Sequence, residues 1–149
     1  MKVLVQRVSR GSVSIGGQTV GQIARGFVVL MGVRTGDTAA DAEYLAQKTV
    51  SLRIFPDAQD RMNLSIEDVK GELLVISQFT LYAETKKGNR PSFIGAAPAA
   101  EADALYQNYV AAVRRALGEN RVATGVFGAS MVVEIVNDGP VTIELTTDR

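Results

Sequence analysis

The feature that restricts the fold most strongly is an extended segment at residues 71–84, GELLVISQFTLYAE, the longest strand candidate in the chain. Its middle, residues 73–76, is apolar at every position. A strand with one face in water alternates apolar and polar residues, whereas a strand covered on both faces is apolar throughout. The chain must therefore fold into layers that cover both faces of this strand.

The other strand candidates are short apolar or alternating runs: residues 2–8, 12–15, 19–23, 27–33, 51–55, 131–136 and 141–145. Gly16 and Gly17 stand between two of these runs, which predicts a hairpin over residues 12–23. Pro56 ends the candidate at residues 51–55, and the segment NLSIEDV after it is irregular or a short strand.

Two amphipathic segments predict helices. Thr38 can cap the first, and Asp41 follows at the spacing of a capping box. The second spans residues 98–118, with a proline in its first turn and a glycine at its end. Their apolar stripes are Ala42, Leu45, Ala46 and Thr49 in the first helix, and Ala102, Leu105, Tyr106, Tyr109, Val113, Ala116 and Leu117 in the second. We expect an α+β fold in which residues 1–149 form a single domain: a mostly antiparallel, barrel-like sheet with two main helices on one side.

The composition excludes several classes of enzyme, because the chain contains neither histidine nor cysteine. A Ser-His-Asp triad, a thiolate nucleophile and an imidazole or thiolate zinc site are all ruled out. No acidic segment suggests a metal cluster, and no Walker or dinucleotide-binding glycine motif is present. We therefore expect no metal ion and no cofactor. Any catalysis must use hydroxyls, carboxylates, Lys or Arg, backbone groups or the substrate itself.

Charge is balanced overall, at 16 basic and 16 acidic residues, but it is unevenly distributed. The first acid is Asp37, and the basic residues are concentrated before it and in the segment KKGNR: Lys2, Arg7, Arg10, Arg25, Arg34, Lys86, Lys87 and Arg90. These residues form either a basic face for phosphates or an ordinary solvated surface. The start of the chain is unlike a signal peptide and no apolar run reaches the length of a membrane helix, so we expect a cytoplasmic protein without membrane contact.

Three segments combine polar, glycine or aromatic residues in a way that suits a ligand. SQFT at residues 77–80 brings hydrogen-bonding side chains into a covered strand, where they are either paired structurally or face a cavity. KKGNRPSF at 86–93 suits an RNA end, since it offers cations for phosphates and an aromatic ring for a base. TGVFGASM at 124–131 is either a bulged strand entry or a wall of small residues beside a ligand.

Asn137, Asp138, Gly139 and Pro140 interrupt two strand-like runs near the end of the chain. A proline-tolerant turn at a sheet edge explains this segment without any function. The alternative is a functional X-Pro turn with a cis bond. The segment alone leaves both interpretations open.

Seven motifs, in order along nearly the whole chain, resemble those of the D-aminoacyl-tRNA deacylase family: VQRV (5–8), LRIF (52–55), MNLS (62–65), SQFTLY (77–82), RPSF (90–93), TGVFGASM (124–131) and NDGPVT (137–142). The resemblance implies hydrolysis of the ester between a D-amino acid and the terminal ribose of tRNA. It also implies a homodimer with each active site at the subunit interface, and the 3′ end of aminoacyl-tRNA as the partner.

The resemblance also implies the site residues. Thr80, Gln78 and Phe79 are the expected catalytic residues, and Ser77 shares their pocket. The expected substrate-binding residues are Ser77, Phe127, Ala129, Met131, Gly139 and Pro140, where Gly139 and Pro140 form a cis peptide that enters the partner subunit's pocket. From their charge, we expect contacts to tRNA phosphates from Arg7, Lys86, Lys87 and Arg90.

An amino ester is activated, so well-placed N–H donors and the neighbouring ribose 2′-hydroxyl can hydrolyse it without histidine. Thr80 is an alternative nucleophile, but no base stands beside it in sequence. We expect the cis Gly139-Pro140 motif to act as a chirality filter. It should reject L-aminoacyl-tRNA and accept glycyl-tRNA. Two other classes compatible with the sequence are a non-catalytic module that binds tRNA ends and a general small-ester hydrolase.

Overall fold

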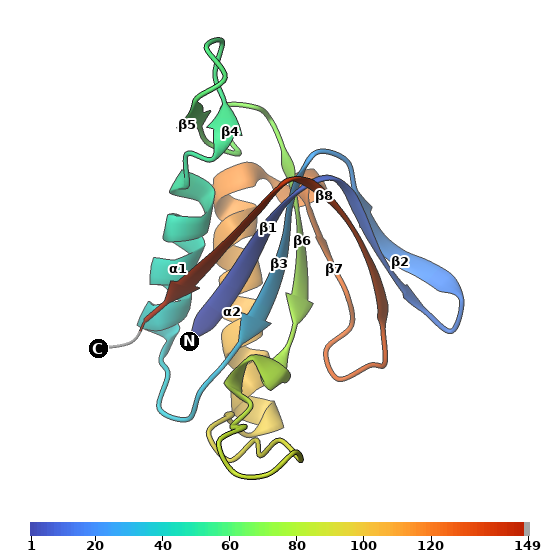
Figure 1. The fold of residues 1–149 in the computed structure, drawn as a ribbon, viewed down its shortest axis with the longest axis vertical. Helices are drawn as coiled ribbons and strands as arrows, with labels where there is room; N and C mark the ends of the chain where they lie inside the picture. Colours follow the sequence, from blue (N-terminus) through green and yellow to red (C-terminus); the bar gives the residue numbers. More distant parts are fainter. Residues whose placement is uncertain (148–149) are drawn as a thin grey trace.

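One long strand organises the sheet of the computed structural model, which describes residues 1–147 (Figure 1). This strand is β1, Lys2–Ile15. It pairs antiparallel with β3 (Gly26–Gly32) along its first half and with β2 (Gln18–Ile23) along its second half. On its other side it pairs with β8 (Val132–Thr146) along almost its full length. The predicted strands 2–8 and 12–15 are therefore one continuous strand, and the predicted turn at Gly16-Gly17 joins it to β2.

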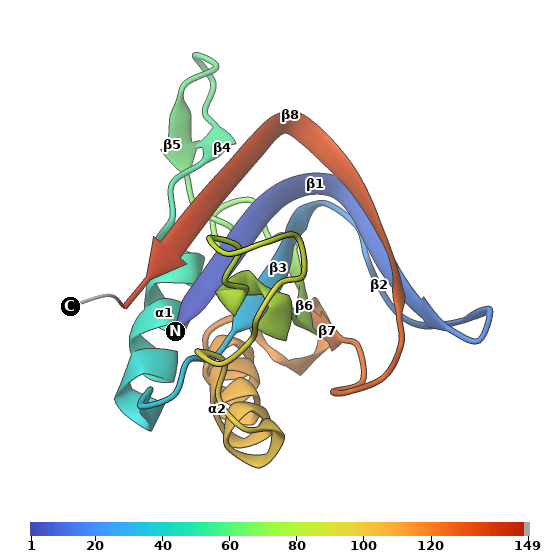
Figure 2. The ribbon, with the colours of Figure 1, turned by 60° about the horizontal axis from the view of Figure 1, so that its bottom comes forward.

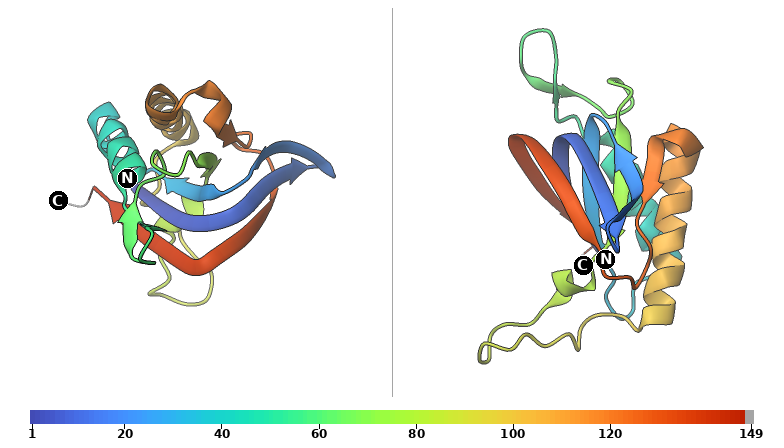
Figure 3. Two further views of the ribbon diagram at one scale, coloured as in Figure 1. Left: turned by 90° about the horizontal axis from the view of Figure 1, so that it is seen from above. Right: turned by 90° about the vertical axis from the view of Figure 1, so that its right-hand side faces the viewer.

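Two parallel strands extend the sheet beyond β3. β6 (Glu72–Ser77) pairs with β3, and β7 (Val122–Thr124) pairs with β6. The sheet is mixed and strongly curved, so that it nearly closes into a barrel (Figure 3, left). Gly21 on β2 lies against β7, because a Cβ atom at this position would be 2.7 Å from the Thr124 carbonyl oxygen. The predicted α+β fold with a barrel-like sheet is confirmed, although the pairs beyond β3 are parallel.

The two helices α1 (Ala39–Ser51) and α2 (Ala99–Leu117) cover one face of the sheet (Figure 3). The predicted capping box is present, since the Thr38 hydroxyl accepts from the Asp41 N–H and the Asp41 carboxylate accepts from the Thr38 N–H. Gly118 ends α2 with φ = 99°, a conformation that favours glycine. In residues 1–147 neither helix has the length and apolar content needed to cross a bilayer.

Strand β6 separates two groups of buried apolar side chains. Leu73 and Val75 belong to the larger core between the sheet and the helices. Leu74 and Ile76 face a smaller core inside the curve of the sheet, together with residues of β1, β2 and β3. All four side chains are almost completely buried. The prediction that both faces of residues 73–76 are covered is confirmed.

Three predicted strand boundaries are wrong. The segment 71–84 stops being a strand at Ser77, because its partner β3 ends at Gly32, and a 3₁₀ helix η1 (Phe79–Tyr82) follows. The segment 51–55 contributes only β4 (Phe55–Pro56), which pairs with β5 (Met62–Leu64) in a projecting hairpin. The last two predicted strands are the single strand β8, which bends sharply at residues 137–140 while it follows β1 (Figure 2).

Candidate active site

A cavity of about 570 Å³ lies between the end of β6, helix α2, the loop before α2 and the turn before β8. Its lining residues are mostly apolar and come from distant parts of the chain: Met31, Val33, Ile76, Ser77, Gln78, Phe79, Phe93, Ala96, Ala97, Ala99, Ala102, Tyr106, Phe127, Gly128, Ala129, Met131 and Val133. The structure thus brings together six of the predicted site residues: Ser77, Gln78, Phe79, Phe127, Ala129 and Met131.

The polar side of the cavity is the junction of β6 and η1. The Gln78 N–H donates to the Met31 carbonyl at 2.7 Å, which fixes the chain where the strand ends. The Gln78 side-chain amide donates to the Thr80 hydroxyl. Thr80 itself is exposed on η1 and is not among the residues that line the cavity. Its hydroxyl accepts from an amide, which cannot activate it as a nucleophile.

A glycine lets η1 lie directly against the sheet. A Cβ atom at Gly32 would be 3.0 Å from the Leu81 Cβ and 3.1 Å from the Gln78 carbonyl oxygen. These distances are shorter than ordinary van der Waals contacts. The Gln78 oxygen belongs to the backbone, so it could not move aside as the end of a flexible side chain could. The close approach of β3 to η1 therefore fixes the position of Gln78 and Phe79.

Tyr106 of α2 forms the inner wall of the cavity. Its hydroxyl donates to the Val75 carbonyl at 2.9 Å, and its ring lies 6.0 Å from the ring of Phe127. Burial raises the pKa of Tyr106 to about 12, so its hydroxyl stays protonated near neutral pH. Tyr106 is therefore suited to shape the cavity and not to transfer protons. In the sequence, Tyr106 belongs to the apolar stripe of the second predicted helix, and this stripe predicted only a core residue.

The cavity lining includes two aromatic rings that contact each other, and one of them belongs to a basic loop. Phe79, which is 54% exposed, meets Phe93 edge to face at a centroid distance of 4.9 Å. Phe93 belongs to the loop of residues 83–98, which projects beyond the sheet (Figure 3, right). The same loop carries Lys86, Lys87 and Arg90, all exposed. Three of the four predicted phosphate contacts thus lie together on one exposed loop.

Arg7, the fourth predicted phosphate contact, points inward. It is only 8% exposed, and its guanidinium donates to the Ile54 carbonyl at 2.6 Å and to the Asp138 carbonyl at 3.1 Å. Nε also lies 3.6 Å from the Asp138 carboxylate. The guanidinium group of Arg7 is therefore engaged by partners inside the protein. We therefore correct the assignment of Arg7 from a tRNA contact to a clamp on the bend of β8.

The bend of β8 holds Gly139 and Pro140, whose peptide bond is cis as predicted. Neither residue lines the cavity. The bend lies at the opposite end of the sheet from η1 (Figure 1). The structure of this chain therefore does not bring Gly139 and Pro140 together with Ser77–Phe79. Among residues 1–147, no three carboxylates gather as they do in a metal site.

The comparisons with known proteins agree with these features. Residues 4–146 match the sequence model of the D-Tyr-tRNA(Tyr) deacylase family. The chain belongs to this family. A D-aminoacyl-tRNA deacylase of Dehalococcoides mccartyi strain BAV1 is 57% identical over 145 residues, which are 97% of this chain and 94% of that protein. A D-aminoacyl-tRNA deacylase of Clostridium novyi is 48% identical over 149 residues, which are 100% of this chain and 99% of that protein.

Two solved structures are also similar. The c-Myc DNA unwinding element binding protein superposes with a TM-score of 0.95 and is 40% identical, with 100% of both chains covered. A probable eukaryotic D-amino acid tRNA deacylase superposes with a TM-score of 0.81 and covers 97% of both chains. Its identity is 19%, so it supports the fold of the family alone.

Sequence reasoning missed one side of the deacylase-family cavity. Phe93, Ala96, Ala97, Ala102 and Tyr106 line it, and none of them was among the residues assigned to the catalytic or substrate-binding site. Phe93 was expected only as an aromatic ring for an RNA base, from the segment KKGNRPSF. The alanines carry no chemical signal, since they contribute only by being small.

Proposed function

We propose that the protein hydrolyses the ester bond of D-aminoacyl-tRNA and releases the free D-amino acid and tRNA in the cytoplasm. The match of residues 4–146 to the D-Tyr-tRNA(Tyr) deacylase family carries this proposal. The cavity supports it, because an apolar space of about 570 Å³ with one polar side suits an aminoacylated adenosine. The exposed lysines and arginine on the loop of residues 83–98 suit the phosphates that follow.

The chemistry follows from what lines the cavity. Its side chains include no histidine, carboxylate or lysine that could act as a general base. Phe79 and Thr80 begin η1, so their backbone N–H groups have no acceptor within that helix. We assign these N–H groups to the developing oxyanion, where each such donor is typically worth ~10²–10³ in rate. The ribose 2′-hydroxyl of the substrate then assists the proton transfer from water.

Selection for D-residues requires a second subunit. Gly139 and Pro140 lie far from the cavity of their own subunit, and the Arg7 clamp holds the neighbouring Asp138 carbonyl. In a two-fold dimer the bend of one subunit enters the cavity of the other. The carbonyls of Gly139 and Pro140 then accept hydrogen bonds from the α-ammonium group of the substrate. An L-side chain is directed into the protein, a D-side chain into open space, and glycine fits in either case.

Release of D-tyrosine from D-tyrosyl-tRNA by the purified protein tests the activity. A module that only binds tRNA ends would leave the ester intact. Hydrolysis of free D-tyrosine methyl ester at a similar rate would instead favour a general small-ester hydrolase. We expect rapid release of D-tyrosine from the tRNA and no measurable hydrolysis of the methyl ester, because the methyl ester has no ribose 2′-hydroxyl and no phosphates.

Neutralising the basic loop should weaken tRNA binding and make it less dependent on salt. Lys86, Lys87 and Arg90 are replaced together by glutamine. Each lost phosphate contact on a single strand lowers the slope of log K against log salt by about 0.7, so the triple variant should lose about 2. Binding is measured by fluorescence anisotropy across a salt series.

The matched control for the basic loop removes the same charge elsewhere. Lys48, Arg61 and Lys70 are exposed and lie outside the cavity and its loop. Replacing these three by glutamine should leave the slope nearly unchanged. Equal changes in slope for the two triple variants would contradict the placement of tRNA on the loop.

A further inference from the structure

The sulfur atoms of this chain all belong to its four methionines, because it contains no cysteine. It also contains no tryptophan and no histidine. Hydrogen peroxide, which converts a methionine thioether into the sulfoxide, therefore has few other side chains to attack. How fast a given methionine reacts depends on how well the oxidant reaches its sulfur. The four methionines can thus be ranked by their exposure to solvent.

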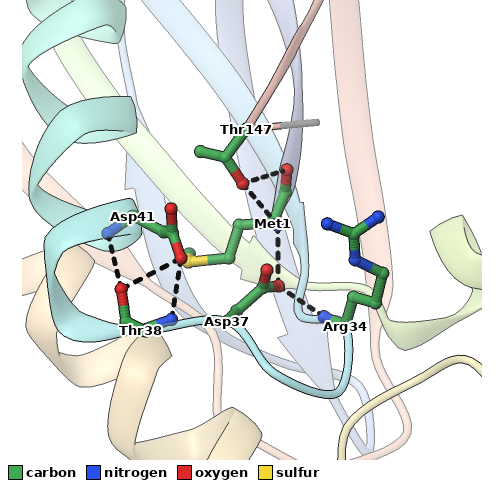
Figure 4. Close-up of polar contacts among 6 residues, drawn as sticks. All are labelled: Met1, Arg34, Asp37, Thr38, Asp41 and Thr147. Carbon is green, nitrogen blue, oxygen red and sulfur yellow. Dashed lines mark hydrogen bonds and ion pairs between the residues drawn. The ribbon is translucent and has the colours of Figure 1, made fainter. Parts of the chain in front are cut away.

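Two of the four methionines are shielded and two are not. The side chain of Met1 points toward the first turn of α1 (Figure 4), and Met1 and Met31 are 0% and 1% exposed within the main core. Met62 is 57% exposed on β5 of the projecting hairpin and does not line the cavity. Met131 is half-buried and lines the cavity. Of these four residues, Met131 alone is both open to solvent and part of the candidate site.

The sulfur of Met131 packs against the backbone of Gly125, directly after β7. A Cβ atom at Gly125 would be 2.5 Å from the Met131 Sδ and 3.6 Å from its Cε, so no further atom fits between them. Elsewhere the side chain of Met131 packs against the smaller apolar core. The space that remains beside the sulfur is the cavity, which Met131 and the adjacent Ile76 both line.

Oxidation of Met131 places an oxygen atom in this space. The sulfur attacks one oxygen of hydrogen peroxide, and the S–O bond forms as the O–O bond breaks. The second oxygen leaves as hydroxide and takes up the proton of the transferred oxygen to become water, while the sulfur is oxidised and the peroxide is reduced. The side chains of Ile76, Phe127 and Val133, which line the same cavity, offer no donor to the new polar oxygen.

We propose that Met131 is an oxidation site of this protein, and that oxygen transfer from hydrogen peroxide to its sulfur blocks the cavity and inactivates the enzyme. The effect on deacylation rests on the proposed function, whereas the oxidation of Met131 itself does not. Methionine sulfoxide is a substrate of dedicated reductases, so this inactivation belongs to the reversible class of oxidations.

The experiment exposes three proteins to hydrogen peroxide: the original protein, Met131→Leu and Met62→Leu. Leucine has nearly the volume of methionine and no sulfur to oxidise. Catalase stops the reaction after increasing times, and peptide mass spectrometry gives the sulfoxide fraction at each methionine. Deacylation of D-tyrosyl-tRNA is measured on the same samples and expressed relative to the untreated sample of the same protein.

Met62 should oxidise fastest and Met131 next, whereas Met1 and Met31 should react at least about ten-fold more slowly than Met131. Activity should fall with the sulfoxide fraction at Met131, to about one-tenth or less when Met131 is fully oxidised. Met62→Leu should lose activity at the same rate as the original protein. Met131→Leu should keep its own starting activity through the same treatment.

Oxidation of Met131 no faster than that of Met31 would overturn the proposal, whatever the activity. Full activity after complete oxidation of Met131 would also overturn it, as would equal relative losses in Met131→Leu and the original protein. The Met62→Leu protein decides the inactivation without any change at Met131, because its other two methionines are shielded. If the untreated protein does not hydrolyse D-tyrosyl-tRNA, the proposed function fails, while the mass spectra still decide whether Met131 is the oxidation site.

Discussion

Replacing Ala129 by phenylalanine should lower the rate of D-tyrosyl-tRNA deacylation by at least ~100-fold while the protein remains folded. Ala129 lies in the turn between β7 and β8, where its N–H donates to the Val126 carbonyl at 3.1 Å. It lines the cavity, and it is half-buried outside both apolar cores. The phenylalanine ring would occupy space in the cavity that the substrate needs. Single-turnover hydrolysis and thermal melting measure the two effects.

The matched control is Ala40→Phe. Ala40 is exposed in the first turn of α1 and does not line the cavity. The same increase in side-chain volume there should leave deacylation within about two-fold of the original rate, as is usual for exposed positions. A normal rate for Ala129→Phe would show that the cavity is not where the substrate binds.

Pairing two inactive subunits should restore about half of the original activity. The first subunit carries Ala129→Phe, which blocks its cavity but leaves its β8 bend intact. The second carries Gly139→Val, which damages the bend but leaves the cavity intact. Gly139 has φ = 127°, and a Cβ atom there would be 2.9 Å from the Val141 Cγ2 and 3.1 Å from the Arg7 Nη2, so valine must displace the bend.

The two variants are coexpressed with different affinity tags, and the heterodimer is purified through both. If the bend acts in the partner subunit, the cavity of the Gly139→Val subunit receives an intact bend and works. The other cavity is blocked and also receives a damaged bend. If the bend served its own cavity, both sites of the heterodimer would be defective. A heterodimer as inactive as the two homodimers would therefore contradict the cross-subunit site.

The sequence predicted the parts of this fold in which local pattern and tertiary environment agree. Residues 73–76 are apolar at every position, and the structure covers both of their faces with separate cores. The capping box at Thr38 and Asp41 and the glycine after α2 set helix ends through local hydrogen bonds and φ, so they are readable from a few residues.

The parts that were missed depend on distant partners. Residues 78–84 continue a strand-like pattern, but β3 ends at Gly32, and the chain turns into η1 for lack of a partner. Residues 137–140 were expected to separate two strands, because no local pattern shows that β8 follows β1 on both sides of this bend. Strand pairing at such sequence separations is set by the whole sheet.

The candidate site shows the same division. Motifs with unusual residues, such as SQFT and TGVFGASM, contribute to the cavity as expected. Tyr106 did not stand out, because a tyrosine within an apolar helical stripe is indistinguishable from a core residue. Arg7 was misassigned because charge alone does not show whether a guanidinium faces solvent or, as here, the carbonyls of Ile54 and Asp138.

The most direct test of the proposed activity is hydrolysis of three aminoacyl esters on one tRNA: D-alanyl, L-alanyl and glycyl. The tRNA and the leaving group are then identical, and only the substituents at the α-carbon differ. We predict rapid release of D-alanine, slower but clear release of glycine, and almost no release of L-alanine. Equal rates for D-alanyl-tRNA and L-alanyl-tRNA would contradict the proposed chirality filter, and no hydrolysis of any of the three would contradict the proposed activity itself.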